Sequence, residues 1–362
     1  MKINESECIQ RLQIIARELL EDTGIVKVIN INPTPSDKSF LVRKTLADFT
    51  IKVRTKDKKQ YSLFIEIKSI GQPRYVRMAV NQLQALISQK GKAYGVFGAP
   101  YVSEESIKIC RENNIGFIDI AGNCLLNFDN IYISIQGKPN LYPATRPLRS
   151  LFTTKSTRAI RVLLYEPKKE WTVKNLAKEA NISLGQMSNL KKKLLDYEFI
   201  EEVKTQRGSR FRILNPEGLL IKWASNYNFN QNIIRNYYSF DDVKTIEEKL
   251  VNYFNSKRIS FAFTLTSGAS LVAPFLRYKR VFSYVANNIE QLAKALNLKE
   301  VSSGPNVTLM EPYDEGIFYG LQEIEGVKVV SDVQLYLDLM SYKERGEEAA
   351  RFLLEQRLKK QW

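Results

Sequence analysis

The sequence predicts a multidomain protein of α/β and α+β class, and three observations predict it. The chain has 362 residues, which at roughly 100–200 residues per domain gives two or three domains. Helical and strand patterns alternate over 1–138, whereas 151–225 contains short helices followed by a hairpin. Three of the twelve prolines fall within 139–150 and mark a linker. The remainder, 226–362, is predicted to be a C-terminal domain of mixed α/β type.

Composition excludes several classes of enzyme and a membrane location. The chain has no histidine, which rules out Ser–His–Asp triads, Cys–His dyads, HNH-type nucleases and histidine-ligated zinc hydrolases. Catalysis here would need carboxylates, lysine, tyrosine or an oxygen-ligated metal. The three cysteines fit no zinc spacing, so we expect reduced thiols and a cytoplasmic protein. The longest apolar stretch, about 93–102, is half a membrane span, and the first residues are polar, so no membrane or signal segment is expected.

Positive charge is concentrated in one part of the chain. The formal net charge is +15. Residues 1–140 carry 20 Lys and Arg against 14 Asp and Glu, 141–225 carry 17 against 8, and 226–362 carry 17 against 17. A chain that is simply lysine-rich would raise all three parts, and the C-terminal part is neutral. The middle part therefore has the charge of a phosphate-binding module.

The first 138 residues predict alternating helices and strands. Apolar spacing of the helical kind and period-two alternation give the order α-β-β-β-α-β-α-β-β. The predicted helices are 4–22, 73–89 and 103–114, and the predicted strands are 26–31, 49–53, 63–67, 93–100, 116–122 and 130–136.

A candidate metal site lies on the predicted hairpin. Asp48 begins one strand, and Glu66 and Lys68 lie on one face of the next because strand side chains alternate. The hairpin brings Asp48 beside them, so two carboxylates and a lysine would hold Mg²⁺ and position a water. The alternative is an exposed strand face with a salt bridge.

This D…E-x-K pattern on these strands resembles the PD-(D/E)xK superfamily, so the resemblance predicts a restriction-endonuclease-like α/β domain over 1–138. It implies that Asp48 and Glu66 hold Mg²⁺ and that Lys68 orients the attacking water. Members often add a polar residue from the following helix, here Gln82 or Gln84, and some add a glutamate from the first helix. Glu18 is the residue available there. The proline that often precedes the family's aspartate is Ala47 in this chain, and a domain kept only for binding is the alternative to an endonuclease.

Residues 151–225 predict a winged helix-turn-helix domain. A helix over 156–165 is followed by two more, with Thr172 and Ser183 as their N-caps and a tight link at 181–183. The segment EEVKTQRGSRFRILN then alternates as a basic hairpin, which is typical of a wing.

The helix after Ser183 is the predicted DNA reader. Its apolar residues face inward, the amides of Gln186 and Asn189 suit adenine edges, and Gly185 and Ser188 are small enough for close approach. Lysines of this helix and arginines of the wing would meet phosphates. A protein-interaction module with solvated charges is the alternative. The predicted DNA-binding residues are Gln186, Ser188, Asn189, Lys191, Lys192, Lys193, Arg207, Arg210 and Arg212.

The C-terminal part offers a weaker enzymatic reading. Residues 265–268 resemble the glycine turn of nucleotidyltransferases, but the following strand, 281–285, lacks the paired carboxylates that those enzymes need. We therefore expect a structural or partner-binding domain. Asp332 is predicted to end a strand and Asp338 to lie on a helix surface, in an ending that forms a long amphipathic helix or a helix pair broken near Gly346.

The tracts SGASLVAPFLRYKRVFSYV and GVKVVSDVQLYLDLMSYKERGEEAARFLLEQ resemble the AbiEi-type antitoxin and transcriptional regulator family of type IV toxin–antitoxin systems. The resemblance covers roughly 150–357. It implies a winged helix that binds inverted repeats at its own promoter and a C-terminal domain needed for antitoxin action. The long N-terminal domain departs from short antitoxins.

Two functions therefore remain open. The first is a DNA-binding transcriptional regulator of the antitoxin kind, with duplex DNA, a toxin or defence-system protein and a second copy of the chain as candidate partners. The second is a Mg²⁺-dependent endonuclease that the winged helix brings to DNA in genome defence or mobile-element biology.

Overall fold

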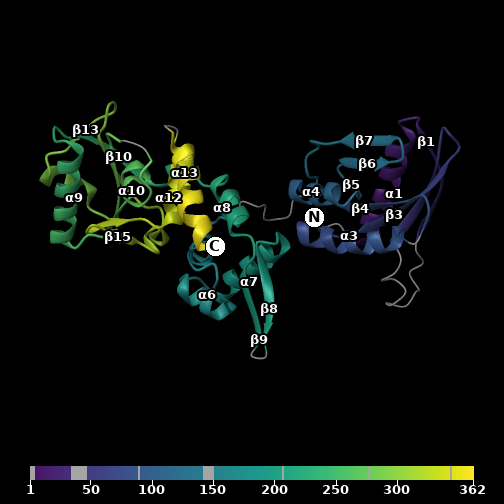
Figure 1. Cartoon of the computed structure of the whole chain (residues 1–362), viewed down its shortest axis with the longest axis horizontal. Helices are drawn as coiled ribbons and strands as arrows, with labels where there is room; N and C mark the ends of the chain where they lie inside the picture. Colours follow the sequence, from purple (N-terminus) through teal and green to yellow (C-terminus); the bar gives the residue numbers. More distant parts are fainter. Residues whose placement is uncertain are drawn as a thin grey trace. The chain divides into compact units, whose positions relative to one another are not determined.

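The computed structural model describes residues 5–33, 47–88, 90–141, 151–205, 208–275, 278–342 and 345–362 (Figure 1). The chain divides into two compact units. The first comprises Met1–Pro147 with Asp196–Glu198, and the second comprises Leu148–Leu195 with Phe199–Trp362. Most of the predicted linker, residues 142–150, lies outside the described residues. Among the helices of the described ranges, none is long and apolar enough to span a membrane.

The first unit is a mixed sheet between helices (Figure 1). Its seven strands follow the chain order, with the β3–β4–β5 pairs parallel and the others antiparallel. The strands are β1 (Val26–Pro33), β2 (Phe49–Thr55), β3 (Gln60–Ile67), β4 (Ala93–Ala99), β5 (Gly116–Asp119), β6 (Cys124–Phe128) and β7 (Ile131–Ile135). The helices are α1 (Glu5–Glu21), α3 (Pro73–Ile87) and α4 (Glu104–Glu112).

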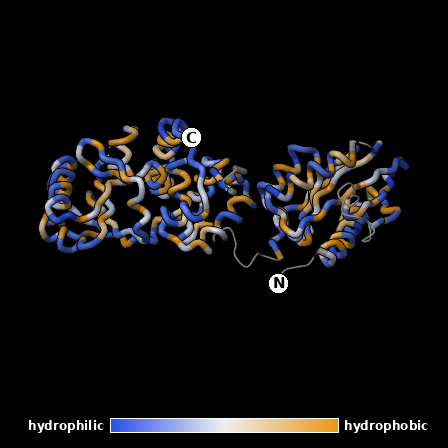
Figure 2. The backbone as a smooth tube through the Cα atoms, turned by 90° about the horizontal axis from the view of Figure 1, so that it is seen from below, coloured by the Kyte–Doolittle hydropathy of each residue, from blue (hydrophilic) through white to orange (hydrophobic). Residues whose placement is uncertain are grey.

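Each face of this sheet has its own apolar core. Alternate residues of β2 and β3, such as Ile51 and Ile65, pack against α1. The intervening residue Phe64 packs with α3 and α4 on the opposite face. Figure 2 shows hydrophobic and hydrophilic stretches following one another along the backbone. The period-two pattern of the sequence thus decides which side chains share a face.

The predicted elements of this unit are confirmed, with one omission. Ser103 caps α4 by accepting from the backbone N–H of Ser106, as expected. The strand β6 was not predicted, and it lies between β5 and β7. Its sequence, CLLNF, is a short apolar run without clean alternation, and such a run gives no strand periodicity.

The second unit begins with three helices and a hairpin. These are α5 (Thr154–Tyr165), α6 (Val173–Glu179), α7 (Leu184–Asp196), β8 (Ile200–Thr205) and β9 (Gly208–Ile213), followed by α8 (Pro216–Ala224). Thr172 caps α6 by accepting from the N–H of Asn175. The strands β8 and β9 pair antiparallel through their whole length.

A second mixed sheet forms the rest of this unit, in the order β13-β10-β14-β12-β11-β16-β15. Its strands are β10 (Ile233–Tyr238), β11 (Phe261–Phe263), β12 (Val281–Val285), β13 (Lys299–Glu300), β14 (Val307–Glu311), β15 (Gln322–Ile324) and β16 (Val327–Val329). The main helices are α9 (Val243–Lys257), α10 (Leu265–Val272), α11 (Ile289–Ala295), α12 (Asp332–Ser341) and α13 (Gly346–Leu353). The helix α12 packs against α5 and α8 from the first part of this unit and against α10 from the second part. The two parts are therefore packed together through α12.

Two expectations for the C-terminal part are wrong. Asp332 does not end a strand, because it is the first residue of α12 and is buried. Asp338 does not lie on a helix surface, because nearly all of α12 is covered by its neighbours and Asp338 is fully buried. Of the two predicted forms of the ending, the helix pair is observed, since α12 ends at Ser341 and α13 begins at Gly346.

Candidate functional site

The first candidate site is the acid–lysine cluster, which we define as Asp48, Glu66, Lys68 and Gln82. Asp48 directly precedes β2, and Phe49 pairs with Ile65 of β3. The same register places Asp48 opposite Glu66, so the two carboxylates leave one face of the sheet.

Hydrogen bonds bring the four residues of this cluster together. The backbone N–H of Ile67 donates to Asp48 Oδ2 at 2.6 Å. The Lys68 ammonium donates to Glu66 Oε1, and Gln82 Nε2, from α3, donates to Glu66 Oε2 at 2.9 Å. Glu66 is only 3% exposed, and the adjacent Lys68 ammonium compensates its buried charge. The structure therefore places all four predicted residues in one cluster.

The donor set of this cluster fits a hard divalent cation. The candidate ligands are carboxylate oxygens of Asp48 and Glu66, and Mg²⁺ usually binds one or two carboxylates together with waters and substrate phosphates. The described residues contain no group of three or more acidic or cysteine side chains in metal-binding reach. Waters or phosphate oxygens would therefore complete the coordination shell.

Two other residues named by the resemblance lie elsewhere. Gln84 is exposed and donates to Asn113 Oδ1 at 3.3 Å. Glu18 is exposed on α1, and α1 packs on the face of the sheet opposite to Glu66. The structure brings neither residue into the cluster.

The second candidate site is the outer surface of α7. Met187, Leu190 and Leu194 are buried, as the spacing predicts. Ser188 and Asn189 are exposed on the remaining faces. The helix therefore presents small and polar side chains outward from a fixed apolar base.

Gln186 has a role that we did not predict. Its side-chain oxygen accepts from the N–H of Ser183 at 3.2 Å, and Ser183 Oγ accepts from the N–H of Gln186 at 3.2 Å. This reciprocal pair is a capping box, and the spacing Ser-x-x-Gln was visible in the sequence. Bidentate contact of Gln186 with an adenine would require the cap to open.

The predicted phosphate-binding cations differ in their surroundings. Lys191 is 16% exposed and pairs with Glu202 of β8 at 2.7 Å. Arg212 pairs with Glu201 at 2.7 Å, and Arg210 lies 3.7 Å from Glu170. Lys192 is exposed and has no ion pair with any described residue. Lys193 is half-buried, and Arg207 lies outside the described residues.

A buried polar junction, not predicted from the sequence, joins α5 to the C-terminal part. Arg158 makes a bidentate contact with Asp314, with nitrogen–oxygen distances of 2.7 to 3.0 Å. Arg161, 1% exposed, donates to Gln334 Oε1 at 2.6 Å and lies over the ring of Trp223. Its Nε and Nη1 are buried without a hydrogen-bond partner among the residues that the structure describes. The spacing of Arg158 and Arg161 puts both on one side of α5, which is the one sequence signal for this junction.

Asp338 is the fully buried end of this network. Its carboxylate accepts from Tyr227, Tyr284, Gln334 and Thr264. Burial raises the pKa of Asp338 to about 6, although the four hydrogen bonds act in the opposite direction. Burial also raises the pKa of both tyrosines well above its ordinary value, so they remain hydrogen-bond donors.

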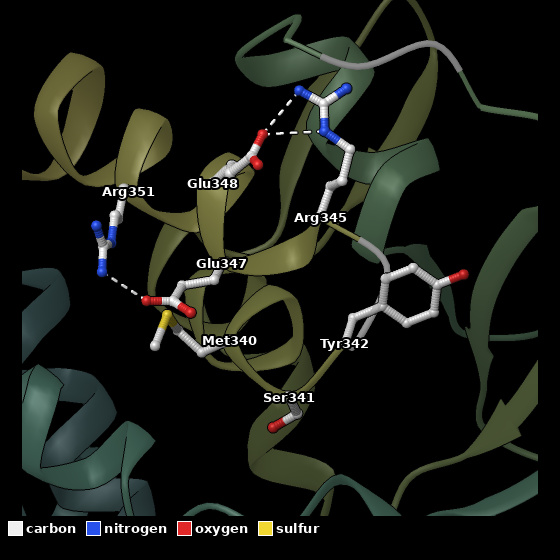
Figure 3. A pocket seen from close by; sticks show the side chains of 7 residues that line it. All are labelled: Met340, Ser341, Tyr342, Arg345, Glu347, Glu348 and Arg351. Atoms are coloured by element: carbon white, nitrogen blue, oxygen red, sulfur yellow. Dashed lines mark hydrogen bonds and ion pairs between the residues drawn. The ribbon is translucent and has the colours of Figure 1, made fainter.

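A depression of about 550 Å³ lies beside the start of α13 (Figure 3). Its charges are matched internally, because Arg345 pairs with Glu348 at 2.7 Å and Arg351 pairs with Glu347 at 2.6 Å. Burial also raises the pKa of the Cys110 thiol to about 12, and all three cysteines are buried and outside any disulfide. Neither feature presents an unmatched charge or a ready nucleophile.

Comparison with known proteins bears on the second unit. Residues 212–359 match the model of the AbiEi_2 family, which is described as "Transcriptional regulator, AbiEi antitoxin, Type IV TA system". This range runs from β9 through α13 to the residues after it. Comparison with curated proteins finds no match.

Two solved structures show weak similarity. The structure described as an EndoMS–dsDNA2 complex is 16% identical, with a TM-score of 0.19, and the match covers 28% of this chain and 41% of that chain. The structure of EndoMS in apo form is 13% identical, with a TM-score of 0.21, and the match covers 36% and 49%. The chain thus spans less than half the length of either, and these TM-scores are too low to show a shared fold.

Proposed function

We propose that this protein is a DNA-binding transcriptional regulator of the antitoxin kind, in which α5–α7 and the β8–β9 hairpin form a winged helix that binds duplex DNA. The observation that carries the proposal is α7, whose apolar side is buried while Ser188, Asn189 and Lys192 are exposed on its other sides. The family match of residues 212–359 supports the regulatory role.

In this proposal, α7 makes two kinds of contact with DNA, one with base edges and one with phosphates. Asn189 reads a base edge in the major groove, and Ser188 allows close approach. Lys192 and Lys193 contact phosphates, which fixes the register of the helix on the duplex without reading sequence. Three other cations, Lys191, Arg210 and Arg212, are already close to glutamates. Each of them contacts a phosphate only after it has left its glutamate. The target would be an inverted repeat upstream of its own gene, bound by two copies of the chain, and a toxin would be the protein partner.

The α7 lysines provide the test of DNA binding. Lys192→Gln with Lys193→Gln is expected to lower affinity for the upstream duplex roughly 10- to 100-fold at low salt and to reduce the salt slope by about 2, because each lost phosphate contact removes about 0.9. Fluorescence anisotropy across a series of KCl concentrations measures both quantities.

The matched control is Lys244→Gln with Lys257→Gln, which removes the same charge from exposed positions on α9. Its affinity and slope should equal those of the unsubstituted protein. Equal slopes for the α7 variant and the unsubstituted protein would contradict the assignment of α7 to DNA.

A second function is favoured by the acid–lysine cluster. We propose that it supports Mg²⁺-dependent cleavage of DNA, with Asp48 and Glu66 as the metal-holding carboxylates. A bound Mg²⁺ would supply Lewis-acid stabilisation of a phosphoryl oxygen. Lys68 would orient the attacking water, and Gln82 keeps the Glu66 carboxylate turned toward Lys68.

Cleavage of supercoiled plasmid with Mg²⁺ or Mn²⁺ tests this second function. Glu66→Gln and Lys68→Met are each expected to reduce the cleavage rate at least about 100-fold, because each removes a charge from the reacting centre. Gln84→Ala, on the same helix as Gln82 but outside the cluster, is the control and should cleave normally. If the protein binds DNA but shows no metal-dependent cleavage, the nuclease proposal is wrong and only the regulator proposal stands. If cleavage survives in Glu66→Gln, the acid–lysine cluster is not its source.

A further inference from the structure

A second cluster of cations lies on the first unit, far along the same strands from the acid–lysine cluster. We call it the β1–β2 basic surface and define it as Lys27, Lys52, Arg54, Lys56 and Lys58. Lys27 of β1 lies directly opposite Arg54 of β2 in the strand register. Lys52 lies two residues before Arg54 and so shares its face.

The face of the sheet that carries these residues is the face of the acid–lysine cluster. Ile51 and Val53 are buried against α1. The alternating residues Lys52 and Arg54 therefore point to the other face, and two further steps back along this alternation reach Asp48. Both Lys52 and Arg54 are exposed, so the described helices leave this part of the face open.

The surface is hollowed and its charge is unmatched. An open depression of about 520 Å³ is lined by Lys27, Arg54, Lys56 and Lys58, with no acidic side chain among its lining residues. None of the five cations has a side-chain hydrogen bond or ion pair with a described residue. The acid of the turn, Asp57, is exposed and lines no part of the depression.

This arrangement is costly for folding alone. Like charges directly opposite in an antiparallel pair destabilise it, and Lys27 and Arg54 are such a pair. The depression beside α13 shows the contrasting case, in which Arg345 and Arg351 are each paired with a glutamate. An anion that binds between Lys27 and Arg54 would remove the repulsion, and a polyanion would also reach Lys52.

We propose that the β1–β2 basic surface is a second phosphate-binding site, which takes the backbone of duplex DNA and leads it toward Asp48 and Glu66. The six steps along the strand from Asp48 to Arg54 span ~20 Å at ~3.3 Å per residue. That length matches about six base-pair steps at ~3.4 Å each. The proposal rests on the proposed function in that it presupposes a DNA-binding protein, but it assigns residues that the winged helix does not use.

The test compares full-length variants in binding to a labelled duplex across a series of KCl concentrations. Lys52→Gln with Arg54→Gln is expected to lower affinity about tenfold at low salt and to reduce the salt slope by about 2. Lys52→Glu should lose more affinity than Lys52→Gln. The matched control, Lys108→Gln with Arg111→Gln, removes the same charge from exposed positions on α4 and should change neither quantity.

Thermal unfolding separates binding from structure. Because Lys52 and Arg54 are exposed and Arg54 faces a like charge, the variant should melt at the same temperature as the unsubstituted protein or higher. If the α7 variant loses affinity and the Lys52/Arg54 variant does not, this inference is wrong and the winged-helix assignment stands. If the Lys52/Arg54 variant loses affinity and the α7 variant does not, this inference stands and the winged-helix assignment is wrong. A loss confined to single-stranded DNA would overturn the assignment to duplex.

Discussion

Asp314→Ala is expected to lower the free energy of unfolding of the second unit by about 3 kcal/mol, because it leaves the buried guanidinium of Arg158 with only the exposed Glu315 as an acidic partner. The side chain of Asp314 is 4% exposed and accepts three hydrogen bonds from Arg158 and one from the backbone N–H of Gly316. The three tryptophans, Trp171, Trp223 and Trp362, all lie in the second unit. Their fluorescence during denaturant unfolding therefore reports this unit alone.

Glu315→Ala is the control for this experiment. Glu315 also pairs with Arg158, at 2.7 Å, but is 69% exposed. Removing an exposed partner should cost less than about 1 kcal/mol, because solvent replaces the lost contact. If the two variants have equal effects, the buried junction does not hold α5 to the C-terminal part.

Asp338→Asn is expected to change the pH dependence of stability by about 3 kcal/mol in total. The pKa of Asp338 is about 6 in the folded protein, above the ordinary value of 3.8. The folded state therefore binds a proton more tightly than the unfolded state. This contribution to stability is fully present below pH ~4 and is lost as the pH rises through 6, and each pKa unit corresponds to ~1.4 kcal/mol.

The measurement is the difference in unfolding free energy between the unsubstituted protein and Asp338→Asn. As the pH rises from about 4 to 7, the unsubstituted protein should lose stability relative to Asp338→Asn. Tryptophan fluorescence during denaturant unfolding measures this. Tyr227→Phe provides a second variant, because it removes a donor to the Asp338 carboxylate and so raises the pKa of that group further. Its transition should lie at higher pH. A flat difference between pH 4 and 7 would show that Asp338 does not titrate in this range.

Local patterns in the sequence predicted much of the fold. The caps at Ser103 and Thr172 are confirmed and the helix pair with its break near Gly346 is observed, since each depends on residues within a few positions. The placement of Asp48 beside Glu66 could also be predicted, because the register of a hairpin follows from the alternation of apolar and polar residues in its two strands. Gln186 shows that a local signal can be overlooked, since its spacing from Ser183 already indicated the capping box that the structure contains.

By itself the sequence determined the alternation of buried and exposed positions, the helix ends, the hairpin that carries the acid–lysine cluster and the unequal distribution of charge. Only the tertiary structure decided which charges are matched. Lys191 meets Glu202, and Arg158 meets Asp314 across 156 residues of chain. Asp338 is enclosed by side chains from distant elements, so its burial could not follow from its own helix. The physical reason is range: periodicity and capping act within a few residues, whereas desolvation and ion pairing depend on whatever the fold places alongside.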